Sequence, residues 1–236
     1  SGNAYSDDII FLSNLSEIPQ KDIYEGAKEL KRRSLVQQRS IWMAVLPHPI
    51  ANKLALHALE NISPAMILSN FNEATDERLL KSFSRRLGYL PQSDEAKAII
   101  KHWFSEDGLL DKLHSNNQND LAWILIGNIA PVSVQEVLVH IEKLANQPEF
   151  LTRKNEQFIS ITRLIRSIAY EEQYFDQCAK LLSQFALAEK QGENNNSIRE
   201  ILKSLSNVYS PLSFKISPFW SSVIVSPNIC IMPREP

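Results

Sequence analysis

The sequence predicts an all-helical protein in which a small winged-helix-like unit precedes an α-solenoid-like stack of helical repeats. Three observations lead to this prediction. Apolar residues recur at helical spacing along most of the 236 residues. Glycine is scarce, with 6 residues where the usual share is roughly 7%. A short apolar pattern also returns at intervals of about 40 residues, which is typical of two-helix repeats.

The segment from residue 21 to 59 is expected to fold as a helix, a β-hairpin and a second helix. Apolar positions between residues 21 and 33 follow helical spacing, with charged residues between them. The stretches 34–38 and 41–45 read as two brief strands around a polar turn. A helical pattern returns over 50–59, where Pro49 suits a first helical position. This is the order of the second half of a winged helix, and we place such a domain at 5–60.

Beyond residue 60, four segments share an apolar triad with spacings of three and then four residues, and a small residue follows each triad. The third members of the triads lie about 42, 39 and 37 residues apart, as in HEAT-like or tetratricopeptide-like repeats. Second helices are expected at 94–104, 133–145 and 173–187, which gives a helical-repeat domain over 61–210. The alternative is an irregular bundle of ordinary amphipathic helices. The triads with their small residues are Leu80, Phe83, Leu87 and Gly88; Ala122, Leu125, Ile129 and Ala130; Ile161, Leu164, Ile168 and Ala169; and Ile198, Ile201, Leu205 and Ser206.

The last part of the chain, 211–236, has a different pattern. Four prolines, at 211, 218, 227 and 233, bound short clusters that alternate like strands. The aromatic pair Phe219 and Trp220 indicates that this segment docks on another surface. We expect an extended tail.

No pattern in the sequence carries catalytic chemistry. The glycines do not form a phosphate-binding loop with a following Lys and Ser or Thr. The five histidines do not pair at the three- or four-residue spacing of a helical metal site, and no Gly-x-Ser-x-Gly motif occurs. We therefore expect a chain that is not an enzyme and that holds no cofactor or metal of its own.

Two basic clusters are candidates for binding. Lys28, Lys31, Arg32, Arg33 and Arg39 lie on and after the helix before the hairpin, where a winged helix carries its recognition helix. Their alternative interpretation is a charged solvent face with cations at a helix C-terminus. A net charge of −2 and a pI of about 6.2 lack the positive balance of a dedicated nucleic-acid binder. Residues 85 and 86, both arginines beside a tyrosine, form a second basic spot that fits a partner surface.

The chain is expected to be cytoplasmic. Ser1 to Ala4 hold no apolar segment of a signal peptide, and the longest apolar run, from residue 121 to 132, is too short to span a bilayer. Cys178 and Cys230 match neither a disulfide framework nor a zinc pattern, which fits a reducing compartment. Buried thiols are the expected state of both.

Two stretches resemble the region that follows the ATPase core of STAND proteins, the signal-transduction ATPases of the NACHT and NB-ARC type. Residues 29–37, the hairpin and residues 46–55 resemble their winged-helix domain. Residues 77–90 and 128–131 resemble the segment after it, so the likeness covers roughly residues 20 to 145. In that family a Met-His-Asp motif touches the β-phosphate of bound ADP. Pro47-His48-Pro49 stands in its place here, and only the histidine is kept.

The resemblance implies that the chain is part of a longer polypeptide in which a separate core binds ATP or ADP. His48 would then be the one cofactor-contacting residue of this chain. The implied function is a non-catalytic module that links the nucleotide switch to sensor repeats, in signalling or antiphage defence, through protein partners or neighbouring domains. Two alternatives stay open: a winged-helix nucleic-acid-binding protein with a helical effector domain, and a free-standing helical-repeat scaffold.

Overall fold

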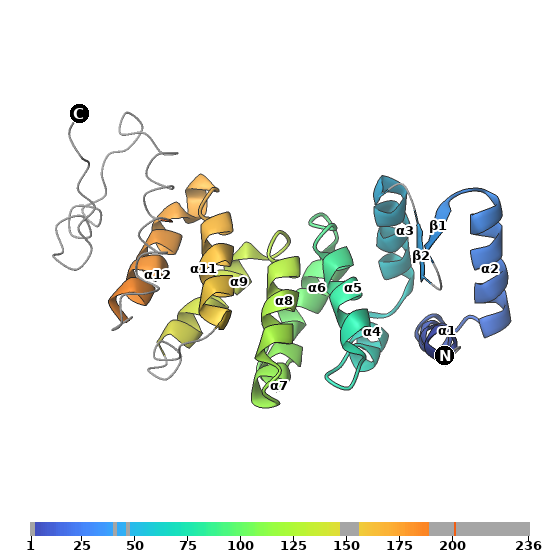
Figure 1. Ribbon diagram of the computed structural model, residues 1–236, viewed down its shortest axis with the longest axis horizontal. Coiled ribbons are helices and arrows are strands. Elements are labelled where there is room, and N and C mark those ends of the chain that lie inside the picture. The colour runs from blue at the N-terminus through green and yellow to red at the C-terminus, as the bar shows by residue number, and fades with distance from the viewer. Residues whose placement is uncertain (1–2, 40–41, 46–47, 147–155, 189–200, 202–236) are drawn as a thin grey trace. The chain divides into compact units, whose positions relative to one another are not determined.

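A computed structural model describes residues 3–39, 42–45, 48–146, 156–188 and 201. The chain divides into two compact units, Ser1–Ser133 and Val134–Pro236, and each is described by itself. In the described residues the fold is mostly helical, with one two-stranded antiparallel sheet, as the sequence predicts (Figure 1). None of the helices described is both long enough and apolar enough to cross a membrane.

The first unit begins with a helix that the sequence did not predict, α1 (Asn3–Ser16). Four of its apolar residues stand in one continuous run, 9–12, which obscures the helical spacing between Phe11 and Leu15. The expected helix, hairpin and helix follow and are confirmed as α2 (Gln20–Arg32), β1 (Val36–Arg39), β2 (Trp42–Val45) and α3 (His48–Asn61).

The turn between α2 and β1 explains why the hairpin begins two residues later than expected. Ser34 has a φ of 58°, in the left-handed region. Its N–H donates to the carbonyl of Lys31, and the N–H of Leu35 donates to that of Leu30. This pair of bonds is a Schellman motif, which satisfies the last carbonyls of the helix and turns the chain away. The turn uses residues 34 and 35, which the sequence assigned to the strand.

The rest of the first unit consists of five helices in two rows. Side-chain caps at Asp76 and Ser93 accept the first N–H groups of two of them. In Figure 1, α5 and α8 stand side by side, and α6 and α7 stand behind them. The five helices are α4 (Pro64–Asn70), α5 (Glu77–Leu87), α6 (Asp94–Trp103), α7 (Leu109–Ser115) and α8 (Asn119–Ile129).

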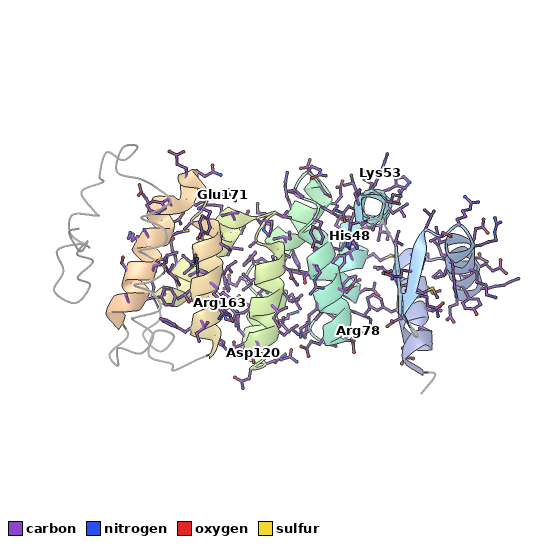
Figure 2. All side chains as sticks on the ribbon, turned by 45° about the horizontal axis from the view of Figure 1, so that its top comes forward. His48, Lys53, Arg78, Asp120, Arg163 and Glu171 are labelled. Carbon is purple, nitrogen blue, oxygen red and sulfur yellow. The ribbon has the colours of Figure 1, made fainter. Side chains whose placement is uncertain are left out.

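Helices α5 and α8 share the most extensive contact of any two elements described. Arg78 and Asp120, each in the first turn of its helix, lie at the same end, so the two helices run parallel (Figure 2). The Asn128 amide donates to the buried Ser84 hydroxyl across the contact, at 2.9 Å. A Cβ on Gly88 would collide with the Asn128 carbonyl oxygen. The small residue at the end of α5 therefore allows the close approach.

Within its described residues, 134–146, 156–188 and 201, the second unit has three helices of 12 to 14 residues and a 3₁₀ turn. The rings of Phe158 and Phe185 meet edge to face at 5.3 Å in its core. Gln177 donates to the Glu142 carboxylate at 2.9 Å, which joins α12 to α9. The elements are α9 (Val134–Ala145), α11 (Glu156–Ile168), η1 (Glu172–Tyr174) and α12 (Phe175–Ala188).

The repeat pattern lies largely in the core. Within the first three triads Phe83 and Leu164 are half-buried and the other members are buried. The small residues Ala130 and Ala169 are buried as well. The expected second helices correspond to α6, to α9, and to η1 with α12. Of the fourth triad, Ile201 is buried, and its remaining members and the tail at 211–236 lie outside the described residues. The domain boundary near residue 60 stays a prediction.

Replacing Gly88 with alanine should destabilise the first unit by about 1–3 kcal/mol, because the new Cβ overpacks the α5–α8 contact. Gly127→Ala is the matched control on α8. A Cβ there meets nothing within 4 Å, so alanine should stabilise the helix by about 1 kcal/mol. Urea denaturation midpoints of both variants measure the difference. Equal effects of the two substitutions would contradict this account of the contact.

Candidate interaction surface

The two parts of the first unit differ sharply in how much they bury. Among residues 3–61 whose side chains are described, the buried ones are Leu15, Ala51 and Leu59. The helices from α4 to α8, in contrast, enclose a continuous core that includes Ile100, Trp103 and many other side chains. A segment of this length with so few buried residues gains little free energy to offset its loss of conformational entropy. The surface of residues 3–61 is therefore the first place to look for a partner.

The shortage of buried side chains is clearest on helix α2. It has the apolar stripe of a core helix, yet no residue on it is buried. Tyr24 is 43% exposed, and Ile23, Ala27 and Leu30 are half-buried. Full burial of a side chain the size of isoleucine is worth about 1.5–3 kcal/mol. Within the described residues, the apolar side chains of the stripe therefore do not gain the full stabilisation that complete burial would give them.

The stripe faces an open apolar groove of about 450 Å³ within the first unit. Helix α1 contributes Phe11 and Leu12 to the groove, and α2 contributes Ile23 and Tyr24. Met43 of β2 also lines it. The volume lies within the range of pockets that hold small ligands or anchoring side chains. The groove therefore has room for several apolar side chains from a partner.

Three aromatic rings, those of Phe11, Phe71 and Phe83, line this groove, and a fourth, Trp103, continues the chain of ring contacts into the core. Phe11 meets Phe71 edge to face with ring centroids 5.1 Å apart. Phe71 stacks on Phe83 at 3.9 Å, and Phe83 meets Trp103 edge to face at 6.0 Å. Such pairs contribute about 0.5–1.5 kcal/mol beyond area burial. This chain attaches α1 to the core formed by α5 and α6, and so fixes one side of the groove.

Two arginines of α5 enter the groove, with different partners. Arg78 forms an ion pair with Asp8 of α1, and its Nε lies 3.8 Å from the Asp76 carboxylate. Arg86 is half-buried and donates to the side-chain amide oxygen of Asn52 on α3. Asn52 is neutral, so Arg86 has no carboxylate partner among the described residues. The sequence singled out residue 86 as part of a basic spot, and the structure places it in the groove.

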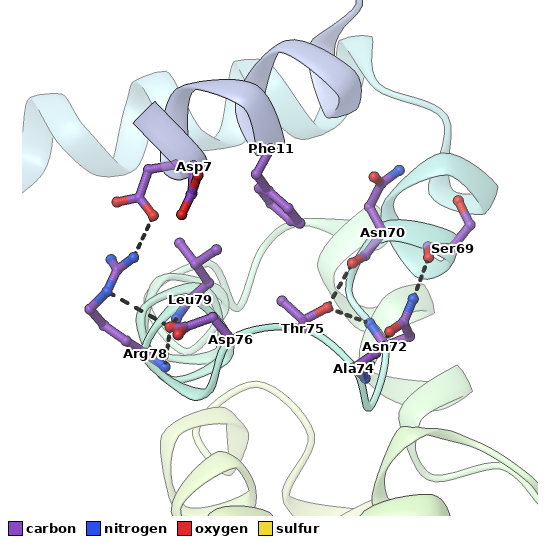
Figure 3. A pocket seen from close by; sticks show the side chains of 11 residues that line it. Asp7, Phe11, Ser69, Asn70, Asn72, Ala74, Thr75, Asp76, Arg78 and Leu79 are labelled. Carbon is purple, nitrogen blue, oxygen red and sulfur yellow. Dashed lines mark hydrogen bonds and ion pairs between the residues drawn. The ribbon is translucent and has the colours of Figure 1, made fainter. Parts of the chain in front are cut away.

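A separate, more polar hollow of about 530 Å³ lies where α1 meets the loop between α4 and α5. Figure 3 shows Asp7 and Phe11 on one side and the loop residues on the other. The loop groups largely satisfy each other: the Thr75 hydroxyl donates to the Asn70 carbonyl, and the Asn72 N–H donates to Thr75 Oγ1. These bonds hold the loop in place and leave it few free donors.

The basic cluster on α2 is largely engaged within the helix and hairpin. Arg32 donates two 2.7 Å bonds to Glu29, and Arg33 donates a third of the same length. Both arginines hold the pKa of Glu29 down at about 2. Lys31 donates to Gln38 of β1, and the Lys28 ammonium lies 4.4 Å from the centroid of the Tyr24 ring. The side chain of Arg39 lies outside the described residues. The spacing of Glu29 three and four residues before the arginines could have revealed this pairing in the sequence.

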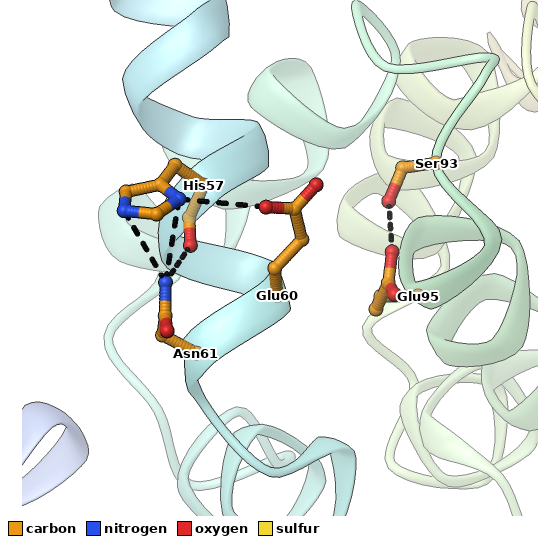
Figure 4. A network of polar contacts seen from close by, with 5 residues as sticks. All are labelled: His57, Glu60, Asn61, Ser93 and Glu95. Atoms are coloured by element: carbon orange, nitrogen blue, oxygen red, sulfur yellow. Dashed lines mark hydrogen bonds and ion pairs between the residues drawn. The ribbon is translucent and has the colours of Figure 1, made fainter.

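His48, the residue that the STAND resemblance singles out, is the first residue of α3 and is exposed (Figure 2). The polar contacts drawn in Figure 4 are local, each between residues at most four positions apart. His57 Nδ1 lies 3.4 Å from the Glu60 carboxylate on the same helix. Ser93 donates to Glu95 while accepting the N–H of Ala96, which is the role of a helix cap. These contacts explain local structure and do not assemble a nucleophile with a base.

The one cysteine among the described residues, Cys178, is buried in the second unit. Burial, with a smaller effect of Glu171, raises the pKa of Cys178 to about 12, so this thiol stays protonated and unreactive at neutral pH. Cys230 lies outside the described residues. In the part of the chain that is described, no three His, Cys, Asp or Glu side chains gather as a metal site would require.

No protein-family model, curated protein or solved structure matches this chain. The groove and the uncovered stripe of α2 are therefore interpreted from their own geometry. The sequence did not point to Phe11, Leu12 or Phe71, because they come from an unpredicted helix and a loop that meet only in the folded chain.

The carboxyl group of Glu29 should titrate far below its ordinary value of 4.5, near the folded pKa of about 2. Because the folded pKa is depressed, the stabilisation from this group is present above pH 4.5 and is lost as the pH falls toward 2. The carboxyl ¹³C chemical shift followed by NMR measures the midpoint. In an Arg32→Gln/Arg33→Gln variant the midpoint should rise toward 4.5, whereas Lys28→Gln, on the same helix, should leave it low. A midpoint near 4.5 in the unaltered chain would contradict the pairing.

Proposed function

We propose that this chain is a non-catalytic protein-interaction module whose first sixty or so residues bind a partner surface. The observation that carries the proposal is the uncovered apolar stripe of α2 above an apolar groove. A segment that buries so little on its own gains stability when a partner covers it. The helices after residue 61, stacked as an α-solenoid, serve as the firm support for this binding face.

The more specific form of this role is the one that the STAND resemblance implies. In a polypeptide that also carries a nucleotide-binding core, the module would transmit ligand capture on the repeats to the nucleotide switch. The order of helix, hairpin and helix over 20–61 supports this form, as does an exposed His48 at the start of α3. The contacted surface would then be a neighbouring domain of the same polypeptide.

The nucleic-acid alternative has less support. Arg32 and Arg33 both bind Glu29, so a phosphate would have to compete with a carboxylate already in place. Of the remaining cations of the cluster, Lys28 lies over the Tyr24 ring and Lys31 donates to Gln38. A winged-helix recognition helix is expected to present its cations to the DNA.

Hydrogen exchange of the purified chain provides the first test. Amides of α2 and α3 should open with free energies about 3 kcal/mol or more below those of α5 and α8, because α2 has no buried side chain and α3 has only Ala51 and Leu59 among the described residues. Mass spectrometry of peptic peptides measures the difference. Equal protection of α2 and α8 would mean that residues 3–61 are stable alone, and the proposal would lose its main support.

A photo-crosslinking residue at position 24 tests the partner itself in cells of the source organism. The exposed stripe predicts a discrete protein adduct there, and none from Lys97, an exposed control position on α6. The adduct's protein, identified by mass spectrometry and purified, should bind the chain and slow exchange in α2. A nucleic-acid adduct would favour the winged-helix alternative. Absence of any position-dependent adduct would refute the proposed function.

A further inference from the structure

We infer that the groove between α1, α2 and α5 takes an acidic amphipathic helix of a protein partner, with apolar anchors in the groove and a carboxylate on Arg86. The inference rests on the proposed function and adds the chemistry of the partner. It is carried by two independent features of the groove: its apolar walls, and Arg86, which has no carboxylate partner in the part of the chain that the structure describes.

The apolar walls of the groove favour apolar side chains on the partner helix. Leu12 is 45% exposed and Tyr24 is 43% exposed on one side of the groove, while Phe71 and Phe83 form a stacked pair on the other. Aliphatic side chains at positions i, i+4 and i+7 of a helix fit a groove of this kind, because they lie on one face. A volume of about 450 Å³ accommodates a few such side chains rather than a whole domain.

Arg86 favours a partner helix with a negatively charged side chain. The other guanidinium in the groove, on Arg78, is already paired with Asp8. Arg86 is half-buried against apolar walls, and its hydrogen-bond partner, the amide oxygen of Asn52, is neutral, so no carboxylate among the described residues balances its charge. An arginine offers several N–H donors in a planar fork, so it can keep this bond and still bind a carboxylate. A partner with Glu or Asp beside its anchors therefore gains a charge-assisted bond that a neutral or basic helix lacks.

A peptide selection on the full chain tests this choice of partner. The probe is a displayed library of helices of about 16 residues, roughly four turns, with apolar residues fixed along one face and Glu, Gln, Lys, Ser or Ala at random elsewhere. Selected peptides should carry Glu at one position. A matched peptide with Gln there should bind at least about tenfold more weakly, as expected for loss of a charge-assisted hydrogen bond.

Variants of the chain assign the effect to the groove. Arg86→Gln should abolish the preference for Glu over Gln, while Arg85→Gln, one residue earlier and outside the groove, should leave it intact. Arg86→Glu should reverse the preference toward a peptide with Lys, a gain that a misfolded variant could not show. Leu12→Ser and Tyr24→Ser should weaken every selected peptide, whereas Leu54→Ser, equally exposed on α3, should not.

Several outcomes would overturn the inference. These are peptides selected without an acidic position, binding that is unchanged by Arg86→Gln, and self-association that is lost in Tyr24→Ser, which would identify a second copy of the chain as the occupant. Each of them leaves the proposed function standing if crosslinking at position 24 still yields a protein adduct. If no protein adduct forms at position 24, both the inference and the proposed function are refuted.

Discussion

The chain of aromatic contacts through Phe11, Phe71, Phe83 and Trp103 is the interaction that attaches the outer helix α1 to the core of the first unit. Their rings connect α1 to a buried tryptophan through side chains from four separate segments. Without them α1 would have little to hold it, since Leu15 is its one buried residue among those described. Three of these rings, those of Phe11, Phe71 and Phe83, also line the groove, so one set of contacts both stabilises the fold and shapes the binding surface.

Buried side chains are distributed unevenly in the first unit. One part of the unit is closely packed and stable, and the other part presents a surface for binding. The pairing of α5 with α8 is closely packed, because Gly88 lets the chains approach and Ser84 receives the Asn128 amide across the contact. The helices before residue 61 have little comparable packing. A binding face that is completed only by its partner is compatible with such a support, because the closely packed helices need not reorganise when a partner covers α1 to α3.

The arginines on the two sides of α2 differ in whether a carboxylate is bound to them. On the solvent side, Glu29 engages Arg32 and Arg33, which removes the most basic part of the helix from competition for phosphate. Toward the groove, Arg86 of α5 stays without a carboxylate among the described residues. The two sides differ because Glu29 stands within one turn of its arginines, whereas the nearest acid of the groove, Asp8, is already bound to Arg78.

The sequence by itself determined the helical class, the hairpin after α2, most helix positions after residue 76 and the burial of the repeated triads. These features follow from spacing within one or two turns and from caps such as Asp76, which are local. Tertiary structure alone decided which apolar faces were covered. The stripe of α2 looks like a core face in the sequence, and Phe11 and Phe71 show no relation there. Coverage depends on contacts between distant segments, which residue spacing does not encode.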